Sequence, residues 1–194
     1  MMQRAQMRLQ DTAQIKPGHP FRGAIEALPD GDAAVVHIRD ADPNKGIDWP
    51  ALVRTELQGR KDPDWLRAGD ILFAARGNRN FAACVGEPPV KAVCSPHFFV
   101  VRINPGSPAT PEFVTWLLNQ PEAQKYFAQS AEGTFITSIR RQVLEDIPLT
   151  LPPLPLQRTI IALHHAALRE KELLEQLIAN RQQQLNIISK QILN

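Results

Sequence analysis

The C-terminal part of the chain is the feature that most constrains its fold. No Gly or Pro follows Pro155, and apolar residues recur there at steps of mostly three and four, the spacing of one helix face. The sequence therefore predicts one helix over residues 157–193, about 55 Å long at the ideal rise per residue. One wall of a domain does not need that length. The pattern favours an exposed, coiled-coil-type helix with a partner helix, and packing on its own domain is the alternative.

The apolar face of this helix is a predicted dimerisation seam. Glu170, Arg181 and Gln184 interrupt it, so the heptad pattern is imperfect. The seam consists of Leu156, Ile160, Leu163, Ala167, Leu174, Leu177, Leu185, Ile188 and Ile192.

Four prolines, at positions 148, 152, 153 and 155, stand directly before the helix. Each proline disfavours helical backbone in the residue before it, so residues 148–153 are expected to be extended. Pro155 is tolerated near a helix start, where an N–H has no partner. We expect this segment to be a hinge between a globular domain (residues 1–152) and a helical spacer (residues 153–194).

The first 152 residues indicate a mixed fold. The β-branched stretch AAVVHIRD predicts a strand at residues 33–40, and turn residues separate four more strands in a meander, at about 70–75, 81–86, 90–94 and 97–103. Pro111 and Pro121 are expected to begin two short helices, and residues 140–147 to form one helical turn or a short helix. The predicted class is α/β (α+β): a twisted, mostly antiparallel sheet with short flanking helices, followed by one long C-terminal helix.

Composition excludes several classes of protein. Residues 1–152 carry 17 basic and 17 acidic side chains, so the net charge does not indicate a nucleic-acid partner. No apolar run spans a membrane and the N-terminus has no apolar signal core, so we expect a cytoplasmic chain without a membrane partner. Cys84 and Cys94 could face each other across a hairpin at GEPPVK, although two buried thiols are the simplest interpretation.

No catalytic chemistry is recognisable. No glycine-rich loop joins a strand to a helix to hold a cofactor phosphate, and no His or Cys spacing suits a metal ion. We therefore predict no catalytic residue, no metal site and no cofactor.

Two loops carry hydrogen-bonding groups suited to DNA. Arg matches guanine and Asn matches adenine in the major groove, while Arg, Thr and Ser also bind phosphates. Ordinary solvated turns are the alternative. The candidate DNA-binding residues are Arg76, Asn78, Arg79 and Asn80 in the first loop, Thr134, Ser138 and Arg140 in the second, and Arg39, Asn44 and Lys45 after the 33–40 strand.

Three segments, in this order, resemble the specificity (S) subunit of type I restriction–modification systems. LRAGDILFAARG (66–77) is similar to that family's Gly-Asp-Ile-Leu strand and Arg-Gly turn, and FVTWLLNQPEAQKYF (113–127) to its paired short helices. GTFITSIRRQVLEDIPLTLPPLPLQRTII (133–161) resembles its Leu-Pro-Pro-Leu passage into a long helix. Pro155 and Leu156 stand where the family commonly has acidic residues.

The resemblance implies one target recognition domain with one spacer helix, a half-length S subunit without catalysis. Such a subunit would read one half of a split site in double-stranded DNA and position the adenine-methyltransferase (M) subunits and the translocating nuclease (R) subunit. Two copies could form a homodimer that matches a palindromic split site. A protein-interaction adaptor or inhibitor that pairs with a full-length S subunit is the alternative.

Overall fold

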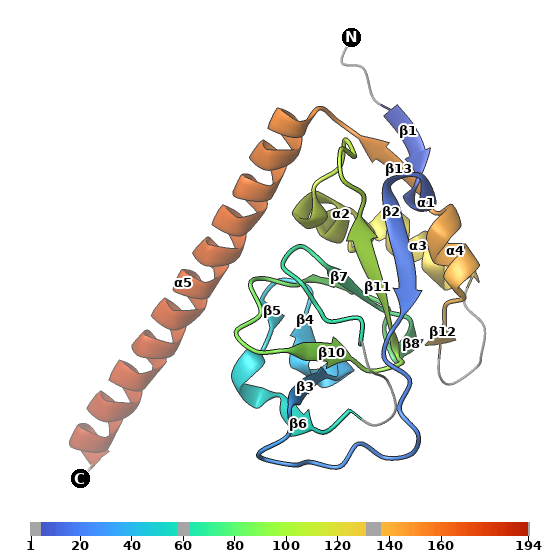
Figure 1. The fold of residues 1–194 in the computed structure, drawn as a ribbon. Helices are drawn as coiled ribbons and strands as arrows, with labels where there is room; N and C mark the ends of the chain where they lie inside the picture. Colours follow the sequence, from blue (N-terminus) through green and yellow to red (C-terminus); the bar gives the residue numbers. More distant parts are fainter. Residues whose placement is uncertain (1–4, 58–62, 131–136, 194) are drawn as a thin grey trace. The chain divides into compact units, whose positions relative to one another are not determined.

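The computed structural model describes residues 5–57, 63–130 and 137–193, which divide into two units, residues 1–157 and 158–194 (Figure 1). The strands are β1 (Ala5–Arg8), β2 (Ala13–Pro17), β3 (Ala33–Val36), β4 (Ala41–Asp42), β5 (Gly46–Ile47), β6 (Val53–Thr55), β7 (Ile71–Ala74), β8 (Arg76–Gly77), β9 (Ala82–Cys84), β10 (Ala92–Cys94), β11 (Phe98–Ile103), β12 (Thr137–Ser138) and β13 (Pro148–Leu151). The helices are α1 (Leu9–Thr12), α2 (Pro111–Leu118), α3 (Pro121–Ser130), α4 (Arg141–Asp146) and α5 (Leu154–Leu193), with 3₁₀ turns η1 (Ile38–Asp40) and η2 (Trp49–Ala51).

A four-stranded antiparallel sheet, in the order β2-β11-β7-β9, lies at the centre of the first unit. All four residues of β7 are buried. Leu72 and Ala74 belong to a core cluster shared with the β10-β3-β6 sheet, while the ring of Phe73 lies 4.7 Å from that of Phe127 in α3. Both faces of β7 are therefore covered, as its continuous apolar run predicts. The predicted mostly antiparallel sheet with short flanking helices is confirmed.

The predicted meander is wrong at both connections of β10, which pairs with neither β9 nor β11. β9 pairs with β7, but β10 pairs in parallel with β3, so Cys84 and Cys94 do not face each other across a hairpin. Both thiols are free. Burial raises the pKa of Cys84 to about 11 and that of Cys94 to about 12, which keeps both thiols protonated and weakly reactive at neutral pH.

The predicted strand at residues 33–40 is shorter in the structure. β3 ends at Val36, and Ile38–Asp40 turn as η1. The carboxylate of Asp40 accepts the backbone N–H of His37 at 2.9 Å, which stabilises the turn and ends the strand.

A buried ion pair joins the start of β7 to β11. The guanidinium of Arg102 donates two hydrogen bonds of 2.7 Å to Asp70, whose side chain is 1% exposed, and the backbone N–H of Arg67 donates a third. Arg102 also binds Asp64 at 3.1 Å. Burial tends to raise the pKa of Asp64, but hydrogen bonds from Lys16 and Arg102 hold it below its usual value. The Gly-Asp-Ile-Leu stretch thus supplies the carboxylate that fixes β7 to its neighbour.

Side chains also fix the ends of α2. Thr110 accepts the N–H of Phe113 at 3.3 Å and Pro111 occupies the first turn, as predicted. After the helix, the side-chain amide of Asn119 accepts the N–H of Ala82 at 3.0 Å and donates to its carbonyl at 2.8 Å. Asn119 therefore makes with β9 the two bonds that a neighbouring strand would make.

The first part of the proline-rich segment is a strand of the first unit, and the role of the segment as a hinge stays a prediction. Residues Pro148–Leu151 are extended, as predicted, but they form β13 and pair with β1. The fully buried amide of Gln157 donates to the carbonyls of Pro108 (2.6 Å) and Pro152 (2.8 Å) and accepts the N–H of Thr110 at 3.0 Å. These bonds attach the first turn of α5 to the domain.

The second unit is a continuous helix, as the sequence predicts. At 100° per residue, the nine predicted seam residues fall within an arc of about 100°. Exposed large side chains on this arc include Leu163 (65%), Leu185 (60%) and Ile192 (75%). No helix in the described part of the chain is both long and apolar enough to cross a membrane.

Replacing Asp70 by Asn tests the ion pair. The neutral amide leaves the partly buried Arg102 without its main countercharge, so Asp70→Asn should lower the free energy of unfolding by about 3 kcal/mol. Urea denaturation measures the loss. Asp64→Asn is the matched control: this side chain is 31% exposed, so its loss should be at most about 1 kcal/mol. Equal losses would contradict a special role for Asp70.

Candidate nucleic-acid interface

The two loops predicted to contact DNA are hydrogen-bonded to each other. β8 pairs with β12, with Thr137 opposite Gly77 and Ser138 opposite Arg76. The N–H of Ile139 donates to the carbonyl of Ala75 at 2.8 Å and extends the ladder by one bond. The structure thus brings two polar loops that are distant in sequence to one edge of the domain, the β8–β12 edge.

The polar side chains at this edge are mostly exposed. Arg76, Asn78, Arg79 and Arg140 are exposed, and Ser138 is half-buried. The guanidinium of Arg79 lies 5.5 Å above the ring of Phe81, an arrangement that restricts this long side chain. Of the predicted residues, Thr134 lies outside the described residues.

Asn80 differs from its neighbours in the same loop. Its side chain is 8% exposed, and its amide nitrogen donates to the carbonyl of Ala74 at 2.9 Å. The N–H of Ala74 in turn donates to the carbonyl of Phe81 at 2.8 Å. Asn80 therefore stabilises the turn between β7 and β9, and its buried amide is not available at the exposed edge.

The η1 turn places Arg39 beside the β8–β12 edge. Gly77 has φ +145°, and a Cβ at this position would lie 3.4 Å from the Cδ1 of Ile38. Arg39 follows Ile38 in the chain. Its side chain is 71% exposed and approaches Asp40 at 3.5 Å, so the predicted loop residue joins the same surface.

Asn44 and Lys45 lie elsewhere. Both donate backbone N–H groups to the Asp42 carboxylate, at 2.8 and 3.0 Å, in the β4–β5 hairpin. Gly46 of this hairpin lies against the carbonyl of Cys84, which is opposite the first residue of β7. Because Arg76 follows the other end of β7, the two groups are roughly 15 Å apart at the rise of a strand.

Sequence reasoning missed two histidines near the edge. The N–H of Ala75 donates to the carbonyl of His97 at 2.9 Å, and His97 itself is exposed. His37, Arg39 and His97 line one pocket of about 520 Å³. The parallel pairing of β3 and β10 brings the two histidines together, and no local sequence pattern predicts that pairing.

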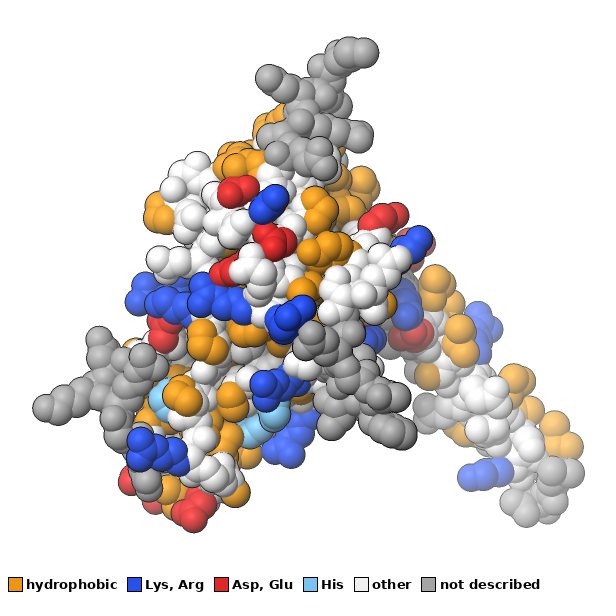
Figure 2. Space-filling view, turned by 90° about the vertical axis from the view of Figure 1, so that its right-hand side faces the viewer, with side chains coloured by type: hydrophobic (Ala, Val, Ile, Leu, Met, Phe, Trp, Pro, Cys, Tyr) orange, Lys and Arg blue, Asp and Glu red, His pale blue; other side chains and the backbone are white. Residues whose placement is uncertain are grey.

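Basic side chains collect on this side of the domain. Figure 2 shows Lys and Arg across the middle and lower part of the face on which Figure 1 labels α4 and β12, with acidic side chains toward the top and bottom of the view. Residues 5–57, 63–130 and 137–193 contain no cluster of three His, Cys, Asp or Glu side chains suited to a metal ion.

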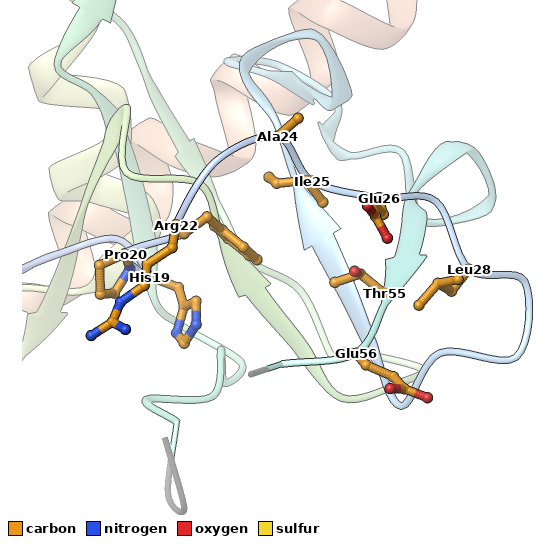
Figure 3. Close-up of a pocket in the computed structure, with 10 residues that line it drawn as sticks. His19, Pro20, Arg22, Ala24, Ile25, Glu26, Leu28, Thr55 and Glu56 are labelled. Atoms are coloured by element: carbon orange, nitrogen blue, oxygen red, sulfur yellow. The ribbon is translucent and has the colours of Figure 1, made fainter. Parts of the chain in front are cut away.

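A second pocket, of about 750 Å³, lies between the segment after β2 and strand β6 (Figure 3). Arg22 lines it together with two carboxylates, Glu26 and Glu56. This mixed charge makes it a poor site for a polyanion.

Comparison with known proteins identifies the fold. No protein-family model and no curated protein matches the chain. The S subunit of the type I restriction–modification system from M. genitalium matches with TM-score 0.55 and 12% identity over 83% of this chain and 38% of that one. The HsdS subunit from Thermoanaerobacter tengcongensis matches with TM-score 0.65 and 21% identity, over 95% and 47%.

A third structure, from work on the structural basis of complex assembly and conformational transition of the type I R-M system, also matches. Its TM-score is 0.69 and its identity 16%, over 95% of this chain and 43% of that one. The domain and its long helix therefore have the fold of type I restriction–modification S subunits, which confirms the resemblance read from the sequence motifs. The chain spans less than half the length of each of these structures.

The structural role of Asn80 gives a prediction. Asn80→Ala leaves the buried Ala74 carbonyl without its side-chain donor and should lower the free energy of unfolding by about 1–2 kcal/mol. Asn78→Ala, the exposed control in the same loop, should change it by less than about 0.5 kcal/mol. Urea titration of both variants distinguishes them, and a silent Asn80→Ala would show that the bond is dispensable.

Proposed function

We propose that the chain is the DNA sequence-recognition part of a type I restriction–modification complex, which reads one half of a split target and performs no catalysis itself. The observation that carries the proposal is the β8–β12 ladder, which gathers Arg, Asn and Ser side chains from two loops at one exposed edge. The shared fold with S subunits supports it.

The side chains at the edge suit both base and phosphate contacts. Arg76 and Arg79 can each donate two hydrogen bonds to guanine, and Asn78 can pair with adenine. Ser138 and Arg140 suit phosphate oxygens. A hydrogen-bonded ladder holds these groups more rigidly than two free loops would, which favours selective base contacts.

The seam of α5 suits pairing with a second helix. Leu174 and Leu177 are 54% and 51% exposed in the middle of the helix, where large apolar side chains in water favour association. We propose that two copies pair through this seam as a homodimer, so that their two domains read two half-sites. M and R subunits would then assemble around the dimer and supply catalysis.

A second candidate function is an adaptor or inhibitor that pairs through α5 with a full-length S subunit. The balanced charge of residues 1–152 favours this candidate, because a balanced surface attracts DNA only locally. DNA binding by the purified chain separates the two functions.

Arg76→Ala and Arg79→Ala should each weaken binding to the preferred DNA by about 10- to 100-fold and relax selectivity at one base position, as loss of a bidentate base contact does. Selection from a random duplex pool, followed by anisotropy titration at fixed salt, measures both effects. Arg67→Ala, an exposed Arg at the opposite end of β7, is the control. If the wild-type chain binds no DNA but pairs with a full-length S subunit, the adaptor function replaces this proposal.

The double variant Leu174→Glu/Leu185→Glu should convert the dimer to a monomer, because it places charge in the seam. Gln176→Glu/Gln183→Glu adds the same charge on the opposite face of the helix and should leave the dimer intact. Sedimentation velocity over a range of concentrations measures the state. A wild-type chain that stays monomeric throughout would contradict the homodimer.

A further inference from the structure

The pocket beside η1 has the form of a groove, which we call the Ser95 groove. The segment after β2 forms one wall and contributes Phe21. The residues around η1 form the other wall and contribute His37 and Arg39, and the turn that contains Ser95 and His97 lies between them in the lining. Its volume is about 520 Å³.

The groove differs in charge from the larger pocket next to it. The two share Phe21 and Ile25, but Glu26 and Glu56 line only the larger pocket among the lining residues that the structure describes. The Ser95 groove contains one Arg and two His among its described lining residues and no carboxylate. Asp40 is the acid nearest to Arg39, and its side chain is 4% exposed and accepts the N–H of His37. Asp40 also lies 3.3 Å from the His37 ring, but it does not line the groove, so an anion in the groove would meet Arg39 and the two histidines and no carboxylate of the described lining.

Ser95 provides an independent sign of a missing ligand. Its side chain is 1% exposed, and its hydroxyl has no hydrogen-bond partner among the described residues. Gly18 packs so closely on the Ser95 carbonyl that a Cβ on Gly18 would lie 2.1 Å from it. An unpaired buried hydroxyl is unfavourable, and a bound hydrogen-bond acceptor would remove that cost.

The groove is continuous with the proposed reading edge. The carbonyl of His97 accepts the N–H of Ala75, one residue before Arg76. Ile38, between His37 and Arg39, lies against Gly77 of β8. A DNA strand whose bases meet Arg76 would therefore pass this groove with its backbone.

We infer that the Ser95 groove holds the sugar–phosphate backbone of the DNA strand whose bases contact the β8–β12 edge. Arg39 and His97 bind phosphate, Ser95 donates to a phosphate oxygen at the floor, and the ring of Phe21 packs on deoxyribose. The inference rests on the proposed function and adds to it a second contact site that positions the duplex without reading its sequence.

Arg39→Ala tests the inference through salt dependence. Loss of one phosphate contact should weaken binding about tenfold on every DNA sequence and lower the slope of log K against log salt by about one, without changing the preferred sequence. Arg39→Lys, which keeps the charge, should retain the slope. Arg67→Ala should behave as the wild type.

Ser95→Ala supplies a second readout. Because the hydroxyl has no partner in the described structure, the variant should keep its urea midpoint, yet lose about tenfold in DNA affinity. If Ser95→Ala and Arg39→Ala both bind as tightly as the wild type, or if Arg39→Ala changes the preferred sequence, the inference is overturned while the proposed function stands. If the wild-type chain binds no DNA, or binds inorganic phosphate but no DNA, both the inference and the proposed function are overturned.

Discussion

The ion pair of Asp70 and Arg102 is the interaction on which the β8–β12 edge of the domain depends. It fixes the start of β7 against β11 with two short charge-assisted hydrogen bonds to the buried carboxylate of Asp70. β7 leads directly into β8, and β8 pairs with β12. The ion pair thus anchors the beginning of the strand that leads to Arg76.

Balanced charge hides a local imbalance in this domain. Several acids are occupied within the fold: Asp64 and Asp70 bind Arg102, while Asp40 and Asp42 accept backbone N–H groups. Arg76 and Arg79 in contrast are exposed. A domain with equal numbers of acids and bases can thus present a basic edge, and the count of charges alone conceals it.

Sequence patterns predicted the elements that depend on local chemistry. The helices at Pro111 and Pro121 follow from proline and capping rules, and the long helix follows from its apolar period. The parallel β3–β10 pair could not be predicted, because strand order depends on burial between distant segments. For the same reason the groove around Ser95 could not be predicted.

The sequence gives the type of each side chain but not its surroundings. Asn78 and Asn80 are the same residue type in the same loop, yet one is exposed and the other is buried under the turn. Gln157 is polar and lies in the first turn of a helix, and only the fold shows the three hydrogen bonds that attach it to the domain. Such roles depend on which backbone groups a fold leaves unpaired.

The amide of Asn119 has a consequence for how the molecule meets its own copies. β9 is an edge strand, and an open edge invites strand addition and aggregation. By occupying both backbone groups of Ala82, Asn119 blocks this template with a single side chain. Strand addition at this edge is therefore blocked at Ala82, which leaves β9 with fewer unpaired backbone groups on which a β-type polymer could grow.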